Sequence, residues 1–246
     1  MKKFLFLTLI LISSAIIVSC SSDDEPKAKF RDITLNCGQS YTIADADAVW
    51  TTSNEYIVSV SKNVITAERV GEALISSSKG EFKVTVNGVV PEAYFIPYTN
   101  WGATQSTVKN FMKEYTIFAE EPKALGYSVG AYSYVLYSFD EDRLNTAITI
   151  IDGNYVDDNT IFDFMYERYI LFDINQDINT YYFLTTDQKT LIAFASNKIE
   201  SGVVYMIAYM PYNKSRSLND IKNQFDFAIP KMAASQFIEI PFKQRN

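Results

Sequence analysis

One cysteine near the N-terminus carries the most specific chemistry in this sequence. Cys20 ends the run Ile-Val-Ser-Cys at 17–20, and it follows an apolar stretch at 4–18 that begins after two lysines. Such a stretch is typical of a secretory signal, because a membrane span needs about 20 apolar residues in succession. The polar run Ser-Ser-Asp-Asp-Glu-Pro comes directly afterwards. We therefore expect residues 1–19 to be a signal peptide and Cys20 to begin the mature chain.

The run at 17–20 resembles the lipobox of bacterial lipoproteins, which consists of an aliphatic residue, a tolerant position, a small residue and cysteine. The resemblance implies cleavage before Cys20, acylation of its thiol and amine, and a lipid anchor in the outer membrane. Two or three acyl chains, at about 0.8 kcal/mol per buried methylene, anchor a domain stably. The alternative is an ordinary signal peptide in which Cys20 is incidental.

The segment that follows, 20–30, is expected to be an acidic tether. Its acidic residues at 23–25 look like the export tag that sends some Gram-negative lipoproteins to the cell surface. A solvated linker explains the same residues equally well. We expect a cell-surface location, with the membrane contacted through the lipid at Cys20.

Metal and cofactor motifs are missing from the sequence. The chain has no histidine, which excludes a Ser-His-Asp triad and a histidine-ligated zinc. Segment 173–184 starts with the Asp-x-Asn-x-Asp pattern of an EF-hand loop, but Ile178 and Leu184 stand where that loop needs glycine and glutamate. Oxygen-bearing side chains crowd at 152–158, where a turn and a helix cap explain them better than a cation does. We expect no metal and no cofactor.

Catalytic motifs are equally hard to find. Ser76 and Lys79 formally match the serine–lysine start of penicillin-binding enzymes, yet the further motifs of that family are missing and Ser76 lies in an expected strand. A glycosidase needs two carboxylates about 5–9.5 Å apart, and 29 acidic residues leave that arrangement open. The acidic clusters at 120–121 and 140–142 are expected in solvated turns. We predict a protein that is not an enzyme and has no catalytic residue.

Charge and cysteine content restrict the partners. The chain carries 22 Lys and Arg against 29 Asp and Glu, a net charge of −7, and no basic run is longer than two residues. A chain of this charge repels phosphate backbones, so we expect no nucleic-acid partner. Once Cys20 is acylated, Cys37 is the single remaining thiol, which cannot form an internal disulfide.

Residues 31–90 are predicted to form a β-sandwich domain. Apolar and polar residues alternate in short runs, with turn signals every 8–12 residues. The runs at 49–54, 58–60, 64–67 and 71–75 resemble the bacterial immunoglobulin-like domain of group 2, although its usual glycine near Asn63 is missing. The resemblance implies a spacer or adhesive module. Trp50 is expected in the core, and Cys37 is expected to be buried as a small hydrophobe that alternates inward with Ile33 and Leu35.

Residues 91–246 are predicted to form an α+β domain. This part holds 15 of the 17 tyrosines and 13 of the 17 phenylalanines. A helix is expected from Thr104, and a hairpin is expected from strands at 132–139 and 144–151. The third strand is expected at 203–210, and the tail from Ser217 is expected to add a short helix and a final strand.

Two echoes indicate a tandem repeat in this second part. Phe-Met at 111–112 recurs at 164–165, and the segment 137–144 resembles 184–191. Each unit is then a helix, an irregular link, a strand, a turn and a strand. The plan is similar in outline to β-lactamase-inhibitor-like lipoprotein domains, a resemblance that transfers no functional residue.

The sequence therefore predicts a cell-envelope lipoprotein that acts as a non-catalytic binding or adhesion module for a protein or a glycan. The ligand-binding residues stay unknown at this stage. The alternatives are a carboxylate-dependent glycan hydrolase and a structural accessory of an outer-membrane assembly. Two converging carboxylates would favour the hydrolase, an exposed aromatic patch a protein partner, and a concave groove with an aromatic wall a glycan.

Overall fold

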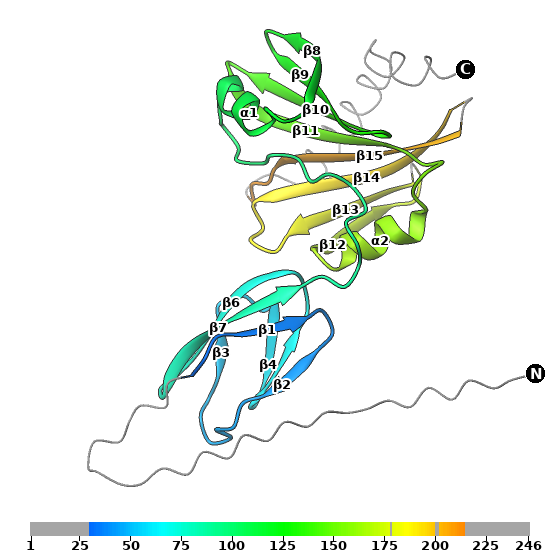
Figure 1. Cartoon of the computed structure of the whole chain (residues 1–246). Coiled ribbons are helices and arrows are strands. Elements are labelled where there is room, and N and C mark those ends of the chain that lie inside the picture. The colour runs from blue at the N-terminus through cyan, green and yellow to red at the C-terminus, as the bar shows by residue number, and fades with distance from the viewer. Residues whose placement is uncertain (1–29, 178, 200–201, 215–246) are drawn as a thin grey trace, which may run out of the picture.

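The computed structural model describes residues 30–177, 179–199 and 202–214. Of the described residues, 52% lie in strands and the sheets have a sandwich-like arrangement, which confirms the β-rich class expected from the sequence. Cys20, the signal peptide at 1–19, nearly all of the tether at 20–30 and the tail from Ser217 lie outside the described residues. Figure 1 shows two small sheets followed by one large sheet.

Two small sheets face each other in the N-terminal part, which we call the sandwich. One sheet has the order β1 (Ile33–Asn36), β7 (Gly80–Asn87), β6 (Gly71–Ser77) and β3 (Thr51–Thr52). The other has the order β2 (Ser40–Thr42), β5 (Val64–Ala67) and β4 (Val58–Ser61). Strands β1 and β7 pair in parallel, whereas β6 and β7 pair antiparallel. Buried and exposed residues alternate along β7, as a strand with one face on a core requires.

Trp50 lies in the core of the sandwich, as the sequence predicts. Its side chain is 5% exposed, and its ring meets those of Phe30 and Phe82 edge-on, with centroids 5.0 and 5.9 Å away. The indole N–H donates to the backbone oxygen of Asp45 at 3.1 Å. A buried indole N–H needs such a polar partner, so both the ring and the N–H of Trp50 are accounted for by a structural role in the core.

Cys37 departs from its prediction in the degree of burial. It turns toward the sandwich core together with Ile33 and Leu35, but all three are half-buried. The reason is position, because Cys37 follows directly on β1, at the end of the sandwich that meets the second part of the chain. Its thiol donates to the backbone oxygen of Glu167 at 3.9 Å, and burial raises the pKa of the thiol.

The described residues of the second part form two helices and one large sheet. The first half contains α1 (Gln105–Phe111), β8 (Thr116–Glu121), β9 (Ala124–Gly130), β10 (Ser133–Asp140) and β11 (Arg143–Asp152). The second half contains α2 (Asp158–Tyr166), β12 (Tyr169–Asn175), β13 (Thr180–Thr185), β14 (Thr190–Ile199) and β15 (Gly202–Pro211). The sheet order is β12-β13-β14-β15-β11-β10-β9-β8. Each half is a helix followed by a four-stranded antiparallel meander, and the halves join where β15 pairs with β11.

The expected repeat is wrong in two details. The irregular link is strand, namely β8 and β9 in the first half and β12 in the second. The echo at 137–144 spans β10 and β11, the third and fourth strands of the first half, whereas 184–191 spans β13 and β14, the second and third strands of the other. The missed strands carry weak alternation, because β8 is mostly exposed and β9 contains two glycines.

The large sheet buries apolar side chains on both of its faces. The helix face carries Val135, Tyr137, Ile192, Phe194, Tyr205, Ile207 and Tyr209, which pack with buried residues of α1 and α2. The opposite face carries Leu136, Ile148, Ile150, Tyr182, Leu184, Leu191, Ala193, Val204, Met206 and Ala208. Neighbouring residues of a strand alternate between the two clusters, as the two-residue period of a strand requires.

Candidate functional site

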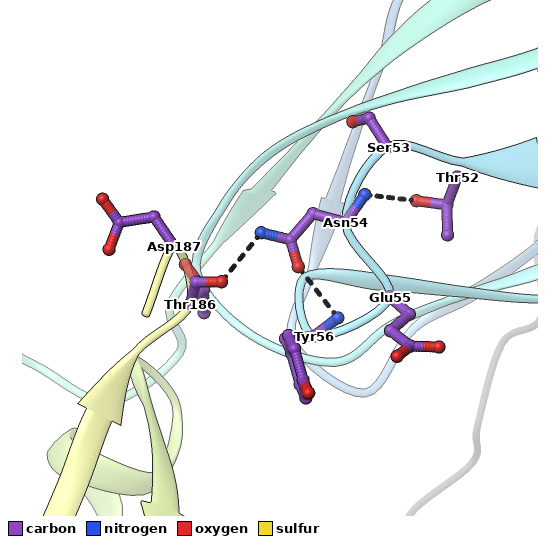
Figure 2. Close-up of a pocket in the computed structure, with 7 residues that line it drawn as sticks. All are labelled: Thr52, Ser53, Asn54, Glu55, Tyr56, Thr186 and Asp187. Carbon is purple, nitrogen blue, oxygen red and sulfur yellow. Dashed lines mark hydrogen bonds between the residues drawn. The ribbon is translucent and has the colours of Figure 1, made fainter. Parts of the chain in front are cut away.

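A polar cleft of about 460 Å³ opens where the sandwich meets the large sheet (Figure 2). One wall is the loop between β3 and β4, and the other is the turn between β13 and β14. The lining residues are Thr52, Ser53, Asn54, Glu55, Tyr56, Thr186 and Asp187. Their side chains supply four hydroxyl groups, one amide and two carboxylates, so the cleft offers a dense set of hydrogen-bonding groups.

Asn54 shapes the first wall and connects it to the second (Figure 2). Its backbone N–H donates to Oγ1 of Thr52 at 3.2 Å, and its Oδ1 accepts from the N–H of Tyr56 at 3.0 Å. Asparagine favours such local side chain to backbone bonds, which is why it stabilises this loop. The other end of its amide, Nδ2, donates to the backbone oxygen of Thr186 at 3.1 Å. One side chain therefore holds both walls.

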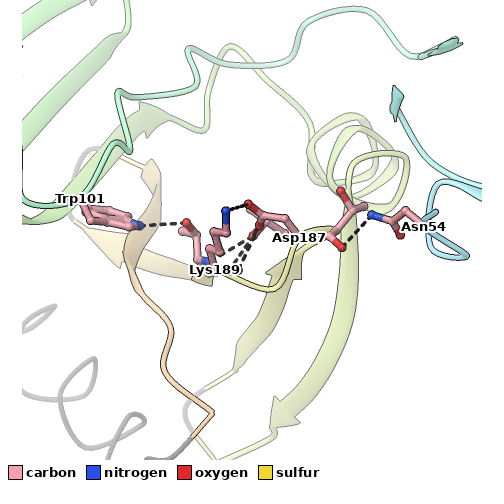
Figure 3. A network of polar contacts seen from close by, with 7 residues as sticks. Asn54, Trp101, Asp187 and Lys189 are labelled. Atoms are coloured by element: carbon pink, nitrogen blue, oxygen red, sulfur yellow. Dashed lines mark hydrogen bonds and ion pairs between the residues drawn. The ribbon is translucent and has the colours of Figure 1, made fainter. Parts of the chain in front are cut away.

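Asp187 organises the second wall through a chain of polar contacts (Figure 3). Its Oδ1 accepts from the hydroxyl of Thr185 at 2.6 Å and from the N–H of Lys189 at 3.0 Å. The N–H of Thr190 donates to Oγ1 of Thr185 at 3.1 Å. The indole N–H of Trp101 donates to Oγ1 of Thr190 at 3.0 Å. Residues of the second part therefore hold this turn in place. The Asp187 side chain nevertheless stays 54% exposed.

A second set of contacts, which we call the joint, holds the sandwich against the end of α2. The carboxylate of Glu167 accepts from the N–H groups of Val89 at 2.8 Å and of Val90 at 3.0 Å. The backbone oxygen of Glu167 accepts from the N–H of Val70 at 2.7 Å. Arg168 contributes an ion pair to the same carboxylate at 3.2 Å. Three backbone N–H groups of the sandwich therefore depend on one residue of the second part, two on its side chain and one on its backbone oxygen.

Arg69 extends the joint toward the cleft. Its Nε donates to the backbone oxygen of Tyr169, the first residue of β12, at 3.1 Å. Its Nη1 donates to the backbone oxygen of Tyr56 at 3.3 Å. Because Tyr56 lines the cleft, the joint and the cleft share one side chain that spans the two parts.

The chemistry of the cleft suits recognition of a polar, hydroxyl-rich ligand. Carboxylates and amides form paired hydrogen bonds with hydroxyl groups, and the ring of Tyr56 supplies an apolar surface for a sugar face. Glu55 and Asp187 stand on different walls of the cleft. Both are exposed side chains, whereas a glycosidase acid is usually shielded in an apolar pocket.

The oxygen-rich segment at 152–158 forms a turn and a helix cap, as the sequence predicts. Asp157 is the N-cap of α2, and its carboxylate accepts from the N–H of Thr160 at 3.0 Å and from the hydroxyl of Thr160. These hydrogen bonds lower the pKa of Asp157. Asp152 accepts from the N–H of Asn154 at 3.0 Å. Within the described ranges, no group of three or more His, Cys, Asp or Glu residues could hold a metal ion.

The remaining sequence candidates have structural positions as well. Ser76 lies in β6, as expected, and its backbone oxygen accepts from the hydroxyl of Thr51. The acidic cluster at 140–142 ends β10 and makes the turn to β11. The cluster at 120–121 belongs to the edge strand β8, which corrects its assignment to a turn. The EF-hand-like segment at 173–184 begins in the last residues of β12 and ends in β13.

The sequence did not reveal the cleft. Asn54 and Thr186 are 132 residues apart, and no local pattern indicates that they meet. No family model matches the chain, and no curated protein and no solved structure does so either. In the part of the chain that the structure describes, no helix has the length and apolar character to cross a membrane.

Proposed function

We propose that this chain is a lipid-anchored protein of the outer membrane that faces the cell surface and binds a ligand without transforming it. In this proposal residues 1–19 are the signal peptide, Cys20 is the lipidation site and 20–30 is the tether. Residues 31–90 are an immunoglobulin-like spacer, and 91–246 are an α+β domain. The lipobox-like run at 17–20 and the sandwich-like sheets support this organisation.

One observation carries the binding function. Both parts of the chain contribute to one polar cleft, and Asn54 and Arg69 hold its surroundings together through hydrogen bonds to the second part. A spacer that only separated two units would not need to share a lined cleft with its neighbour. The hydroxyl, amide and carboxylate lining, with the ring of Tyr56, favours a glycan over an apolar peptide.

An immobilised glycan array, probed with residues 21–246 that carry a fluorescent label, tests the binding function. We expect retention on a subset of glycans, and we expect Asp187→Asn and Glu55→Gln each to reduce it about tenfold or more, because each removes a charged acceptor. Glu81→Gln is the matched control, since Glu81 is an exposed acid of β7 outside the cleft. Retention that all three variants share with the native chain would contradict a glycan site in this cleft.

A glycan hydrolase is the second candidate, because Glu55 and Asp187 line one cleft from two walls. Its distinguishing result is the release of new reducing ends from a bound glycan over time. Loss of that release in both Asp187→Asn and Glu55→Gln, with binding retained, would establish catalysis. Binding without product after prolonged incubation would leave the non-catalytic function standing.

The anchor is tested separately. We expect incorporation of labelled palmitate into the native chain and accumulation of an uncleaved precursor in the presence of globomycin. Cys20→Ser should abolish the label, and Cys37→Ser should retain it as the matched control. Digestion of intact cells with an added protease tests the outward orientation. Palmitate incorporation that survives Cys20→Ser would contradict the proposed lipidation site.

A further inference from the structure

The opposite face of the large sheet is buried although no described helix lies on it. Tyr182, Leu191 and Ala208 on this face are fully shielded from solvent. The buried core residues of α1 and α2 belong to the helix face. Among the described residues, the hydrophobic side chains that pack around the opposite face come from β10, β12 and β15, or from Tyr212 directly after β15. Strands of the same sheet cannot cover their own face, so another segment must do so.

The course of the chain after β15 indicates which segment that is. Strand β15 ends at Pro211, and the side chain of Tyr212 packs against the opposite face. The ring of Tyr212 meets that of Phe172 edge-on, with centroids 6.0 Å apart, and its N–H donates to the backbone oxygen of Lys189 at 2.8 Å. The chain therefore leaves the sheet on this face, and 32 residues, 215–246, still follow.

The N-terminal segment before residue 30 is the other part of the chain to consider as a cover for this face. It joins the described residues at Phe30, whose ring packs against Trp50 and Phe82 in the sandwich. Because the proposed function has residues 1–19 removed as a signal peptide, only residues 20–29 are left on this side, and they are few and largely polar. They cannot supply the apolar surface that ten buried side chains of a sheet face require.

The sequence of 215–246 supplies that surface. Leu218, Ile221 and Phe225 recur at the i, i+3 and i+7 spacing of one helix side, and Pro230 ends the pattern. Ile238, Ile240 and Phe242 then alternate with polar or small residues, as in a strand with one apolar side. The segment thus has an apolar side in its helix-like part and another in its strand-like part, and it has no other core to join among the described residues. Such a segment fits a sheet face made of aliphatic and aromatic side chains.

We propose that residues 215–246 dock on the opposite face of the large sheet of the same chain and form its second covering layer. The interaction surface is the cluster that contains Tyr182, Leu191 and Met206, and its occupant is the apolar C-terminal segment. Displacement of this segment would expose a contiguous apolar patch, which is the kind of surface that recruits partners or causes aggregation. The large sheet is then a three-layer unit, with helices on one side and the C-terminal segment on the other.

A cut at a defined position tests the docking. A site for a sequence-specific protease is inserted between Lys214 and Ser215 in residues 21–246, and the cut protein is passed through gel filtration. We expect the 215–246 peptide to elute with the sheet-bearing fragment at micromolar concentration. Burial of each methylene group contributes to the binding free energy, and the apolar face buries many such groups. We expect ANS fluorescence to stay low in the cut complex.

Variants of the same protein make the result specific. Phe225→Asp should release the peptide after the cut and raise ANS fluorescence several-fold, whereas Asn223→Asp, a polar position of the same segment, should do neither. Release of the native peptide with unchanged ANS fluorescence and unchanged mass would overturn the proposal. A stable dimer of the uncut chain, whose dissociation alone raises ANS fluorescence, would overturn it in favour of a second copy as the occupant.

Discussion

At the scale of single residues, Asp157 shows how one carboxylate defines where an element begins. It accepts from the backbone N–H and from the hydroxyl of Thr160, and both bonds favour the ionised carboxylate, which lowers its pKa. The first N–H groups of a helix have no partner within the helix, so this cap supplies one. Thr104 has the same task at α1, where its hydroxyl accepts from the N–H of Thr107.

The cap of α2 is a charged carboxylate and the cap of α1 is a neutral hydroxyl, so the stability that each cap contributes should depend differently on pH. A carboxylate with a pKa below its unfolded value stabilises the fold above that value, about 3.9, and the contribution is lost as the pH falls through the folded pKa. Asp157→Ala should therefore lower the melting temperature at pH 7, and the gap to the native chain should narrow below about pH 4. Thr104→Ala should cost about 1 kcal/mol with no such narrowing. Thermal unfolding followed by circular dichroism at pH 3 to 7 measures the melting temperatures of both variants. Equal pH profiles of the two variants would contradict the role of Asp157 as a charged helix cap.

At the scale of elements, the two helices occupy similar places but bury different side chains. The sequence echo equates Phe111 with Phe164, since Phe-Met ends each helical pattern. The following methionines, Met112 and Met165, are both fully buried. Phe164 is 1% exposed, with the Arg168 guanidinium 3.6 Å from the centre of its ring, whereas Phe111 is 47% exposed. The echo thus identifies corresponding turns of helix without identifying the core.

Replacement of the two phenylalanines should separate these roles. Phe164→Ala should lower the free energy of unfolding by about 3–5 kcal/mol, because it leaves a cavity between α2 and the large sheet and removes the surface under Arg168. Phe111→Ala should cost less than about 1 kcal/mol, since its ring contacts Tyr98 at the surface. Urea denaturation followed by tryptophan fluorescence measures both values. Equal losses would show that burial does not distinguish the two positions.

Some features of the fold are determined by a few neighbouring residues, and others are determined by contacts between segments far apart in the sequence. The turn at 140–142 and the cap at Thr104 were predicted correctly, because acidic turn residues and threonine caps act within a few residues. Strand β8 escaped prediction because its apolar residues, such as Ile117 and Phe118, lie partly exposed at a sheet edge. The contact of Asn54 with Thr186 joins loops 132 residues apart, so only the assembled fold reveals it.

At the scale of the whole molecule, the joint determines how the sandwich meets the large sheet. Glu167 is 10% exposed and receives three backbone N–H groups of the sandwich, two at its carboxylate and one at its backbone oxygen. A Cβ on Gly88 would approach the Glu167 carboxylate to 2.8 Å, so the glycine permits the close approach. The bond of the Val90 N–H is partly buried and that of the Val89 N–H is exposed, so loss of the carboxylate leaves chiefly the Val90 N–H without a partner.

Glu167→Ala should therefore loosen the two parts relative to each other. It removes the acceptor of the N–H groups of Val89 and Val90, and the cost of about 1–3 kcal/mol falls mainly on the partly buried Val90, because water reaches the exposed Val89. The sandwich and the sheet keep their own cores. We expect ¹⁵N relaxation to report separate tumbling of the sandwich and the large sheet in the variant and common tumbling in the native chain. Since the cleft takes its walls from both parts, glycan retention on the array should fall as well, although Glu167 does not line the cleft. Glu72→Ala, which removes an exposed ion pair with Lys83 inside the sandwich, is the control and should change neither measurement. Common tumbling in Glu167→Ala would mean that the remaining contacts, those of Arg69, Asn54 and the Glu167 backbone oxygen, suffice to hold the two parts together.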